Sequence, residues 1–288
     1  MKKQIFPAIL FLAAFSLMAD FPTDFQNAQK QFNQRKWEKA AAAFAQTAEN
    51  APAAYKDKCY SYAARALASA RKQNEAEGMA ARIANPEWKS YTRMEILSTL
   101  GKFNELVTQF RTEKIDGWPE EIAYLGYYML GRARVFSRNA AEAVGDLEKA
   151  VAQAGSDERT RILALSALAQ AAQKNGDAAK ALETADKVLS MKTFRGFSAY
   201  LDAALRKAQI LIAQKKFDEA EKSLDALNAE RKWNGGDWHL QYLETRGDLA
   251  AAKGNSENAK KYYAQALEVR ETHTYFKKRV KSKLDKIR

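Results

Sequence analysis

A ten-residue motif recurs along the chain at a nearly constant spacing, and this repetition restricts the fold more than any other feature. The motif reads "RKWEKAAAAF", "GKFNELVTQF", "RNAAEAVGDL", "GDAAKALETA", "KKFDEAEKSL" and "GNSENAKKYY". When the copies are aligned, the third position of the motif is Trp37, Phe103, Ala140, Ala178, Phe217 or Ser256, and we call this position the register. From Phe103 onward the members are 37, 38, 39 and 39 residues apart, and the 66 residues after Trp37 leave room for one degenerate repeat near Glu75. A fixed period of this length indicates stacked helical repeats that pack on their neighbours.

Within each repeat, a residue that is small in most copies is followed four positions later by one that is larger in most copies. The first set is Ala40, Leu106, Ala143, Ala181, Ala220 and Ala259, and the second is Phe44, Phe110, Leu147, Ala185, Leu224 and Tyr263. A matching upstream set of small residues is Ala28, Gly131, Ala169, Ala208 and Gly247. Small residues let two helices cross closely. Gly101, Gly176 and Gly254 come just before the register, where a tight turn between two helices favours glycine. Each repeat is therefore predicted to be two antiparallel helices.

The composition favours an all-α fold. The chain is rich in Ala, Leu, Glu, Lys and Gln, and it has no alternating β-branched runs that would predict strands. Pro22 is expected to precede the first helix, and Pro52, Pro86 and Pro119 are expected at junctions.

The pattern resembles the tetratricopeptide repeat, whose 34-residue helix–turn–helix has small residues at its eighth and twentieth positions. The resemblance covers residues 24 to 270, with the segment from Gly247 to Leu267 as its best match. It implies an all-α, right-handed superhelical solenoid of about seven repeats, spanning residues 20–273, with a C-terminal capping helix. The period exceeds 34 and the family's Trp and Pro signatures are mostly absent. The alternative is a set of amphipathic hairpins without regular stacking.

The resemblance also implies where a partner would bind. In the family the concave face is lined by first-helix residues, including those at the fifth and ninth positions. Here the fifth positions are Phe25, Tyr91, Tyr128, Ser166, Leu205 and Glu244, and the ninth are Gln29, Glu95, Arg132, Gln170, Gln209 and Asp248. None of these repeats combines the Lys and Asn with which some members grip a peptide carboxylate. The partner-binding candidates are Tyr91, Tyr128, Arg132, Gln170 and Gln209; the alternative is that such residues pack against the next repeat.

Aromatic residues gather at the junctions between repeats, namely Trp88, Trp118, Phe194, Phe197, Trp233 and Trp238. One interpretation is that each covers the gap to the next repeat, and the other is that they form a contact ridge. Trp233 and Trp238 are further partner-binding candidates, because Gly235 and Gly236 between them favour a protruding loop.

The last fifteen residues are strongly basic. The whole chain carries 47 basic and 35 acidic residues, a net charge of +12. Helical spacing of Phe276, Val280, Leu284 and Ile287 predicts an amphipathic capping helix over residues 274–288. Its candidates for contact with an anionic lipid or polymer are Lys277, Lys278, Arg279, Lys281 and Lys283; plain capping is the alternative.

The N-terminus predicts export. Lys2 and Lys3 precede an apolar stretch from Ile5 to Met18, an order typical of a signal peptide over residues 1–19 that is cleaved near Ala19. An uncleaved anchor is the alternative. The prediction is a periplasmic or secreted protein, for which nucleic acid is not an expected partner. Cys59, the only cysteine, is expected to be buried.

No catalytic constellation is found in the sequence. His239 and His273 are the only histidines, and they lack metal-ligand neighbours at helical spacing. No catalytic, cofactor-binding or metal-binding residue is therefore predicted. The hypothesis is a non-catalytic scaffold of the bacterial envelope that holds a polypeptide on the concave face. Two alternatives stay open: a binder of the envelope surface or an anionic polymer through the basic tail, and a helical accessory subunit of a separate enzyme.

Overall fold

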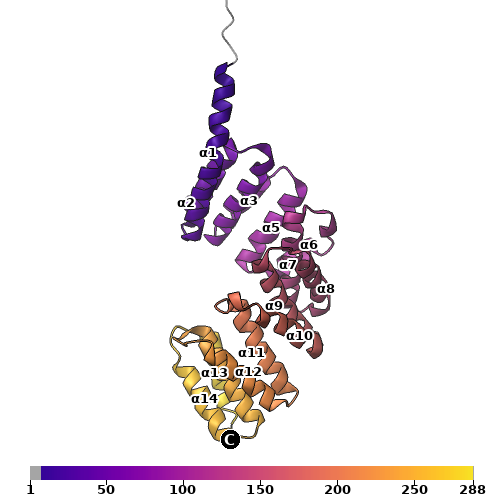
Figure 1. Cartoon of the computed structure of the whole chain (residues 1–288), viewed down its shortest axis with the longest axis vertical. Helices are drawn as coiled ribbons and strands as arrows, with labels where there is room; N and C mark the ends of the chain where they lie inside the picture. The colour runs from indigo at the N-terminus through magenta and orange to yellow at the C-terminus, as the bar shows by residue number, and fades with distance from the viewer. Residues whose placement is uncertain (1–7, 288) are drawn as a thin grey trace, which may run out of the picture. The chain divides into compact units, whose positions relative to one another are not determined.

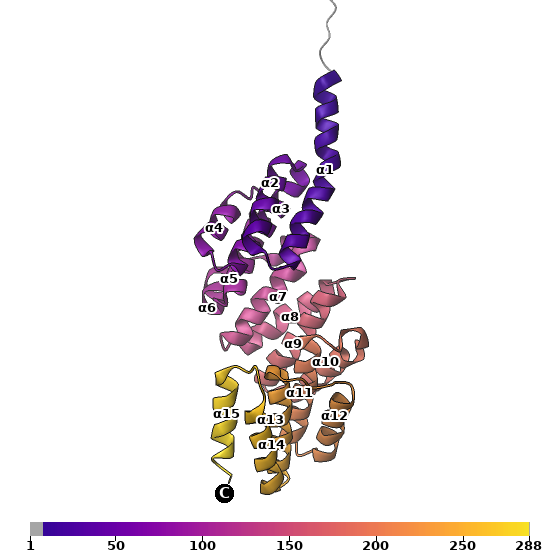
Figure 2. The same ribbon diagram turned by 90° about the vertical axis from the view of Figure 1, so that its left-hand side faces the viewer.

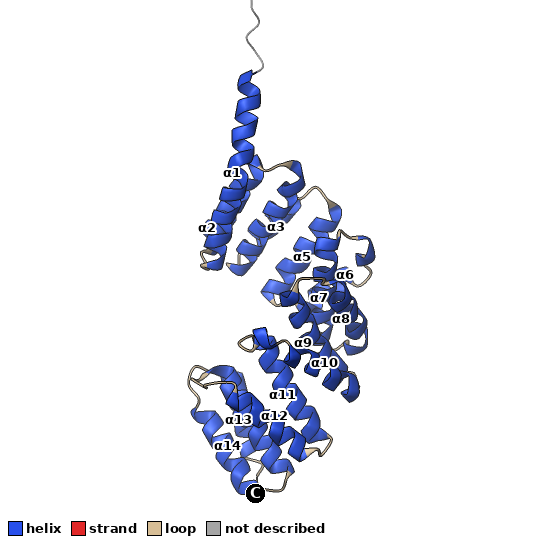
Figure 3. Cartoon of the chain, viewed as in Figure 1, coloured by secondary structure: helices blue, strands red, loops and turns tan. Residues whose placement is uncertain are grey.

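A computed structural model describes residues 8–287, and within this range every regular element is helical (Figure 3). The predicted all-α fold is thus confirmed. Residues 1–7 of the predicted signal peptide lie outside the described residues. The chain divides into an N-terminal unit, Met1–Arg138, and a C-terminal unit, Asn139–Arg288, each with its own core.

The N-terminal unit contains seven α-helices (Figure 1). They are α1 (Ala8–Asn33), α2 (Trp37–Asn50), α3 (Ala53–Ser69), α4 (Gln73–Ala81), α5 (Pro86–Leu100), α6 (Phe103–Phe110) and α7 (Glu120–Phe136), with a 3-10 turn, η1, at Ile115–Gly117. The C-terminal unit contains α8 (Ala140–Gln153), α9 (Glu158–Lys174), α10 (Ala178–Ser190), η2 (Lys192–Phe194), α11 (Ser198–Ala213), α12 (Phe217–Ala229), α13 (Gly236–Ala252), α14 (Ser256–Glu268) and α15 (Thr274–Leu284).

The sequence register marks the start of the second helix of each repeat. Its six members, Trp37, Phe103, Ala140, Ala178, Phe217 and Ser256, are the first residues of α2, α6, α8, α10, α12 and α14. The degenerate repeat predicted near Glu75 is α3 with α4. We call α1, α3, α5, α7, α9, α11 and α13 the first helices and α2 through α14, in even numbers, the second helices.

The small and large residues that follow the register are buried between helices. The small residues at Ala40, Ala143, Ala181, Ala220 and Ala259 are all fully buried, as are Phe44, Leu147 and Leu224 four positions later. At Gly247 of α13 the approach is closest, because a Cβ atom there would lie 2.4 Å from Cε1 of Tyr263 on α14. The small-and-large pattern therefore sets how closely the helices of a repeat can cross.

The turn before each register residue requires left-handed backbone. Gly101, Gly176 and Gly254 have φ angles of +75°, +84° and +79°. The equivalent positions in other repeats have φ near +60° although the residue is not glycine; these are Arg35, Arg71, Arg138 and Lys215. The turn geometry is thus kept even where its usual residue is missing.

The expectation for Pro22 is wrong. Pro22 lies inside α1, which extends back to Ala8. The upstream segment is rich in Ala, Leu, Phe and Met, which continue a helix, and the ring of proline already holds φ near the helical value. Among the described residues, none of the helices has both the length and the apolarity that a bilayer crossing requires.

Cys59 is fully buried in α3, as predicted, beside Tyr60 and Ile83. Burial raises the pKa of its thiol from 9.0 to about 11. At pH 8 the thiolate population, and hence the alkylation rate, is expected to be ~100-fold lower than in the unfolded chain. Labelling with iodoacetamide, followed by mass spectrometry with and without guanidinium, measures this difference. Equal labelling in both states would contradict the burial.

Candidate functional site

The fifth and ninth positions of the first helices were predicted from sequence to bind a partner. In the structure, polar side chains near these positions also join consecutive first helices. In the C-terminal unit Ser166 of α9 donates a hydrogen bond to Asp202 of α11 at 3.1 Å, and the amide of Gln209 donates to Thr245 of α13 at 3.5 Å. Arg206 of α11 reaches back to Asp202 and to Gln173 of α9. These contacts agree with the packing alternative for these positions, and their binding of a partner stays a prediction.

The N-terminal unit has equivalent bridges. Thr92 of α5 donates to Ser61 of α3 at 2.8 Å, and Arg132 of α7 donates to Ser98 of α5 at 3.4 Å. Arg65 of α3 lies 3.5 Å from the carboxylate of Glu95 on α5. These bridges fix the spacing of neighbouring first helices, so the side chains between them are held in a defined array.

Tyr91 and Glu95, both on α5, form a largely enclosed pair in this array. Tyr91 is 6% exposed, and the side chain of Glu95 is 13% exposed. Burial raises the pKa of Glu95, and the nearby charge of Arg65 opposes that shift. Burial also raises the pKa of Tyr91, and the Glu95 carboxylate adds to the effect. Tyr91, a predicted contact residue, therefore has little surface left for a partner.

Tyr128 and Arg132 on α7 keep more exposed surface. Both are half-buried. The guanidinium of Arg132 lies over the rings of Phe103 and Phe136, 5.1 and 5.5 Å from their centroids, and these rings stack on each other at 4.6 Å. A cation held on aromatic faces keeps its outward N–H groups oriented for hydrogen bonding.

Among the seven partner-binding candidates, Gln209 at the ninth position of α11 is the one that is exposed. Gln170 on α9 is half-buried and Gln209 on α11 is exposed. Each amide offers both a donor and an acceptor, so the pair can hydrogen-bond a polypeptide backbone.

The junction candidates Trp233 and Trp238 pack within the C-terminal unit. Trp233 stacks on Tyr242 at 4.9 Å and on His239 at 5.4 Å, and its indole donates to Asn228 at 2.9 Å. Trp238 is half-buried against the same core. The loop between them, which was predicted to protrude, is tied to the segment after α14, because the amide of Gly236 donates to the carbonyl of Arg270 at 2.9 Å.

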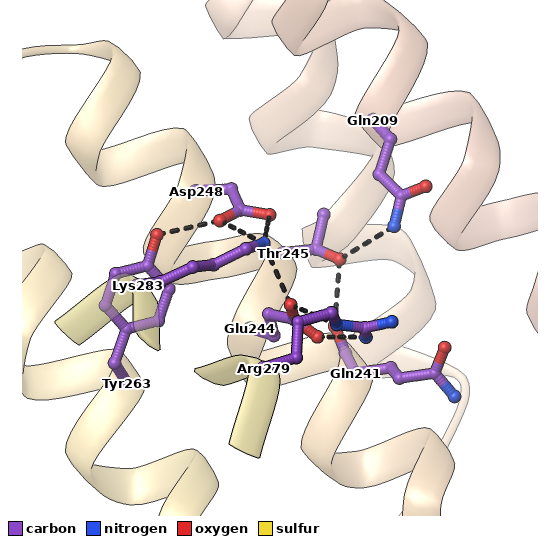
Figure 4. Close-up of polar contacts among 8 residues, drawn as sticks. All are labelled: Gln209, Gln241, Glu244, Thr245, Asp248, Tyr263, Arg279 and Lys283. Carbon is purple, nitrogen blue, oxygen red and sulfur yellow. Dashed lines mark hydrogen bonds and ion pairs between the residues drawn. The ribbon is translucent and has the colours of Figure 1, made fainter. Parts of the chain in front are cut away.

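The basic tail has two chemically different faces. Helix α15 packs against α13 and α14, as Figure 2 shows. On the inner face, Arg279 Nε donates to Glu244 at 2.8 Å and Lys283 Nζ donates to Asp248 at 2.7 Å (Figure 4). Asp248 also accepts from Tyr263 at 2.7 Å. On the outer face, Lys278 and Lys281 are exposed and Lys277 is half-buried.

Sequence reasoning missed two features. It placed Arg279 and Lys283 among the anion-binding candidates, although their offset of 35 residues from Glu244 and Asp248 is close to one repeat and could have paired them. It also missed a pocket of about 450 Å³ between α10, α11 and α12. That pocket is lined by charged side chains that include two ion pairs, Lys207 with Asp186 and Lys192 with Glu230. Its charges are therefore largely balanced.

The surroundings of His239 and His273 can be described directly in the structure. Within residues 8–287 there is no cluster of three or more His, Cys, Asp or Glu side chains with suitable geometry for a metal ion. The backbone amide of His273 donates to Asp237 at 2.8 Å, which ties the start of α15 to the start of α13.

Comparison with known proteins agrees with this geometry. The profile of the tetratricopeptide repeat-like domain matches residues 88–288, well over half of the chain. A solved tetratricopeptide repeat protein from Parabacteroides merdae superposes with a TM-score of 0.55 at 13% identity, over 93% of this chain and 98% of that chain. PilF of Pseudomonas aeruginosa superposes with a TM-score of 0.54 at 12% sequence identity, over 92% of this chain and 98% of that chain. These identities show the fold alone, and no curated protein matches the sequence. The chain belongs to the tetratricopeptide repeat-like family.

Proposed function

We propose that this chain is a non-catalytic, protein-binding scaffold of the bacterial envelope that holds a polypeptide on the face formed by its first helices. The family generally binds protein partners through such helices. The observation that carries the proposal is the exposed Gln209, with half-buried Gln170, on first helices of the C-terminal unit that a polar bridge joins to their neighbours. Within the N-terminal unit, half-buried Tyr128 and Arg132 lie on a first helix that is bridged to its neighbour in the same way. A pre-ordered surface of this kind loses little conformational entropy when a partner binds.

The composition of this face favours an extended or helical peptide segment. In the C-terminal unit the amide groups supply directional hydrogen bonds. In the N-terminal unit Tyr128 and the Arg132–Phe103–Phe136 stack supply apolar and cationic contacts. Export belongs to the same proposal and rests on the basic, then apolar, N-terminal sequence.

Site-specific photocross-linking tests the proposed face. A photoreactive residue at Gln170 or at Gln209 is expected to capture a protein partner from envelope extract, with saturable yield. At exposed Lys261 on second helix α14 the same group is expected to capture none. With the photoreactive group at Gln170, the further change Gln209→Lys is expected to lower the yield at least ~10-fold, and so is Gln170→Lys when the group is at Gln209. The bound partner would bury the unpaired lysine charge, which costs well over 1.4 kcal/mol. Equal capture from Gln170, Gln209 and Lys261 would contradict the proposal.

A second candidate function uses the outer face of α15. Because Arg279 and Lys283 are paired with α13, the cations left for an external anionic surface are Lys277, Lys278 and Lys281. The adjacent Tyr275 is 68% exposed. An aromatic ring beside several lysines suits an anionic membrane surface.

Vesicle sedimentation tests this candidate. The chain is expected to sediment with vesicles of phosphatidylglycerol and phosphatidylcholine at low salt. The triple change of Lys277, Lys278 and Lys281 to Gln is expected to weaken binding ~100-fold, because each surface lysine contributes about 1 kcal/mol. Changing three exposed lysines elsewhere, Lys39, Lys260 and Lys261, is the matched control for net charge. If both triple variants bind equally, α15 is not the contact surface.

A further inference from the structure

Helix α15 occupies the place that the first helix of a further repeat would take. Its contacts with α13 join residues 35 positions apart, Arg279 to Glu244 and Lys283 to Asp248. Bridges between consecutive first helices elsewhere in the C-terminal unit join residues 36 apart, as for Gln209 with Thr245. Moving four residues along α15, from Arg279 to Lys283, also moves four residues forward along α13, from Glu244 to Asp248. The two helices therefore run parallel, as consecutive first helices do.

Both ion pairs and a small apolar contact attach α15 to the repeat. Only Val280 is fully buried in this helix, while Phe276, Leu284 and Ile287 are partly buried. The Glu244 side chain is 4% exposed and contacts both Arg279 and Lys283, whose own side chains are 36% and 34% exposed. A carboxylate enclosed to this degree requires a cation beside it, whichever chain supplies that cation.

We propose that the edge of α13 and α14 at Glu244, Asp248 and Tyr263 is a docking site for a cationic amphipathic helix of a partner protein. Helix α15 is the intramolecular occupant of this site, and the partner helix replaces it. Charge complementarity defines the partner: it carries Arg or Lys at two positions four residues apart, each followed by an aliphatic residue. In α15 these are Arg279 with Val280 and Lys283 with Leu284. Glu244 and Asp248 are the fifth- and ninth-position residues of first helix α13, so this edge is the last part of the first-helix face, and the inference rests on the proposed function.

The intramolecular helix has a large advantage over any free peptide. A segment joined by the short connection 269–273 acts at an effective concentration in the millimolar range. A competing helix is therefore detected most readily when α15 itself has been released. Reversing two charges, by Arg279→Glu together with Lys283→Glu, places two carboxylates against Glu244 and Asp248 and is expected to detach α15 in the full-length chain.

The test measures fluorescence anisotropy with a labelled synthetic peptide of residues 272–288. The full-length double variant is expected to bind this peptide saturably, with at least ~10-fold higher affinity than the wild-type chain. Binding is expected to weaken as salt rises, because ion pairs hold the helix. A peptide that carries the same two charge reversals is the matched control and is expected not to bind.

Two results would overturn the proposal. The first is a double variant that keeps the helical circular dichroism of the wild type and yet does not bind the wild-type peptide. The second is unchanged peptide binding when Glu244→Gln and Asp248→Asn are added to the double variant. Light scattering of the wild-type chain tests whether α15 is exchanged between two copies, and a monomer is expected. A stable dimer that the peptide dissociates would assign the site to a second copy of the chain and not to a partner protein.

Discussion

Replacing Gly247 with valine is expected to lower the melting temperature of the C-terminal unit by about 10 °C, as followed by circular dichroism. A Cβ atom at this position would lie 2.4, 2.6 and 3.0 Å from three atoms of the Tyr263 ring. The ring has little freedom to move, because Tyr263 is 3% exposed and its hydroxyl donates to Asp248. Overpacking of this kind costs about 3 kcal/mol, since the helices of the last repeat must separate.

Gly145 provides the matched control. It also lies inside a helix, α8, but a Cβ atom there would meet nothing within 4 Å. Gly145→Ala is expected to stabilise the chain slightly, by up to ~1 kcal/mol, because alanine favours helix more than glycine does. Combining Gly247→Val with Tyr263→Ala is expected to remove most of the overpacking penalty. An independent, additive effect of these two changes would show that the contact does not set the helix spacing.

Replacing Phe44 with alanine is expected to destabilise the N-terminal unit by about 4 kcal/mol. Phe44 is fully buried, and its ring lies 5.4 Å from that of Phe25 on α1 and 5.1 Å from that of Tyr62 on α3. The truncation leaves a cavity where three consecutive helices meet. Guanidinium unfolding monitored by circular dichroism measures the loss.

Tyr55 is the control for Phe44. It also lies in the N-terminal unit and contacts an aromatic ring, that of Phe21, at 5.1 Å, but it is 48% exposed. Tyr55→Ala is expected to cost less than about 1 kcal/mol, as is usual for exposed side chains. If the two alanine variants lose the same stability, Phe44 is not the packing centre of its repeat.

The sequence was sufficient to predict the helices because their packing repeats. A residue that must be small for two helices to cross recurs once per repeat, and so does the turn before it. For this reason the register residues, from Trp37 to Ser256, coincide with helix starts. The same logic located the degenerate repeat, although the spacing predicted only a position near Glu75 and not Gln73, the first residue of α4.

The polar contacts could not be predicted in the same way. Whether Gln209 faces a partner or Thr245 depends on side-chain orientation, which a repeat period does not encode. Arg279 and Lys283 are predicted from sequence to contact an anionic lipid or polymer, because charge density alone does not reveal which face of a helix is covered. Pro22 was misplaced because proline is a weaker stop signal where the preceding residues favour helix.

Hydroxyl-radical footprinting of the full-length chain, with and without envelope extract, tests the central claim most directly. The claim is that the first helices form the partner-binding face. The extract is expected to protect side chains on first helices, most clearly Tyr128 on α7, while half-buried Tyr262 on second helix α14 keeps its oxidation rate. Protection confined to the second helices, or no change on any first helix, would contradict the account.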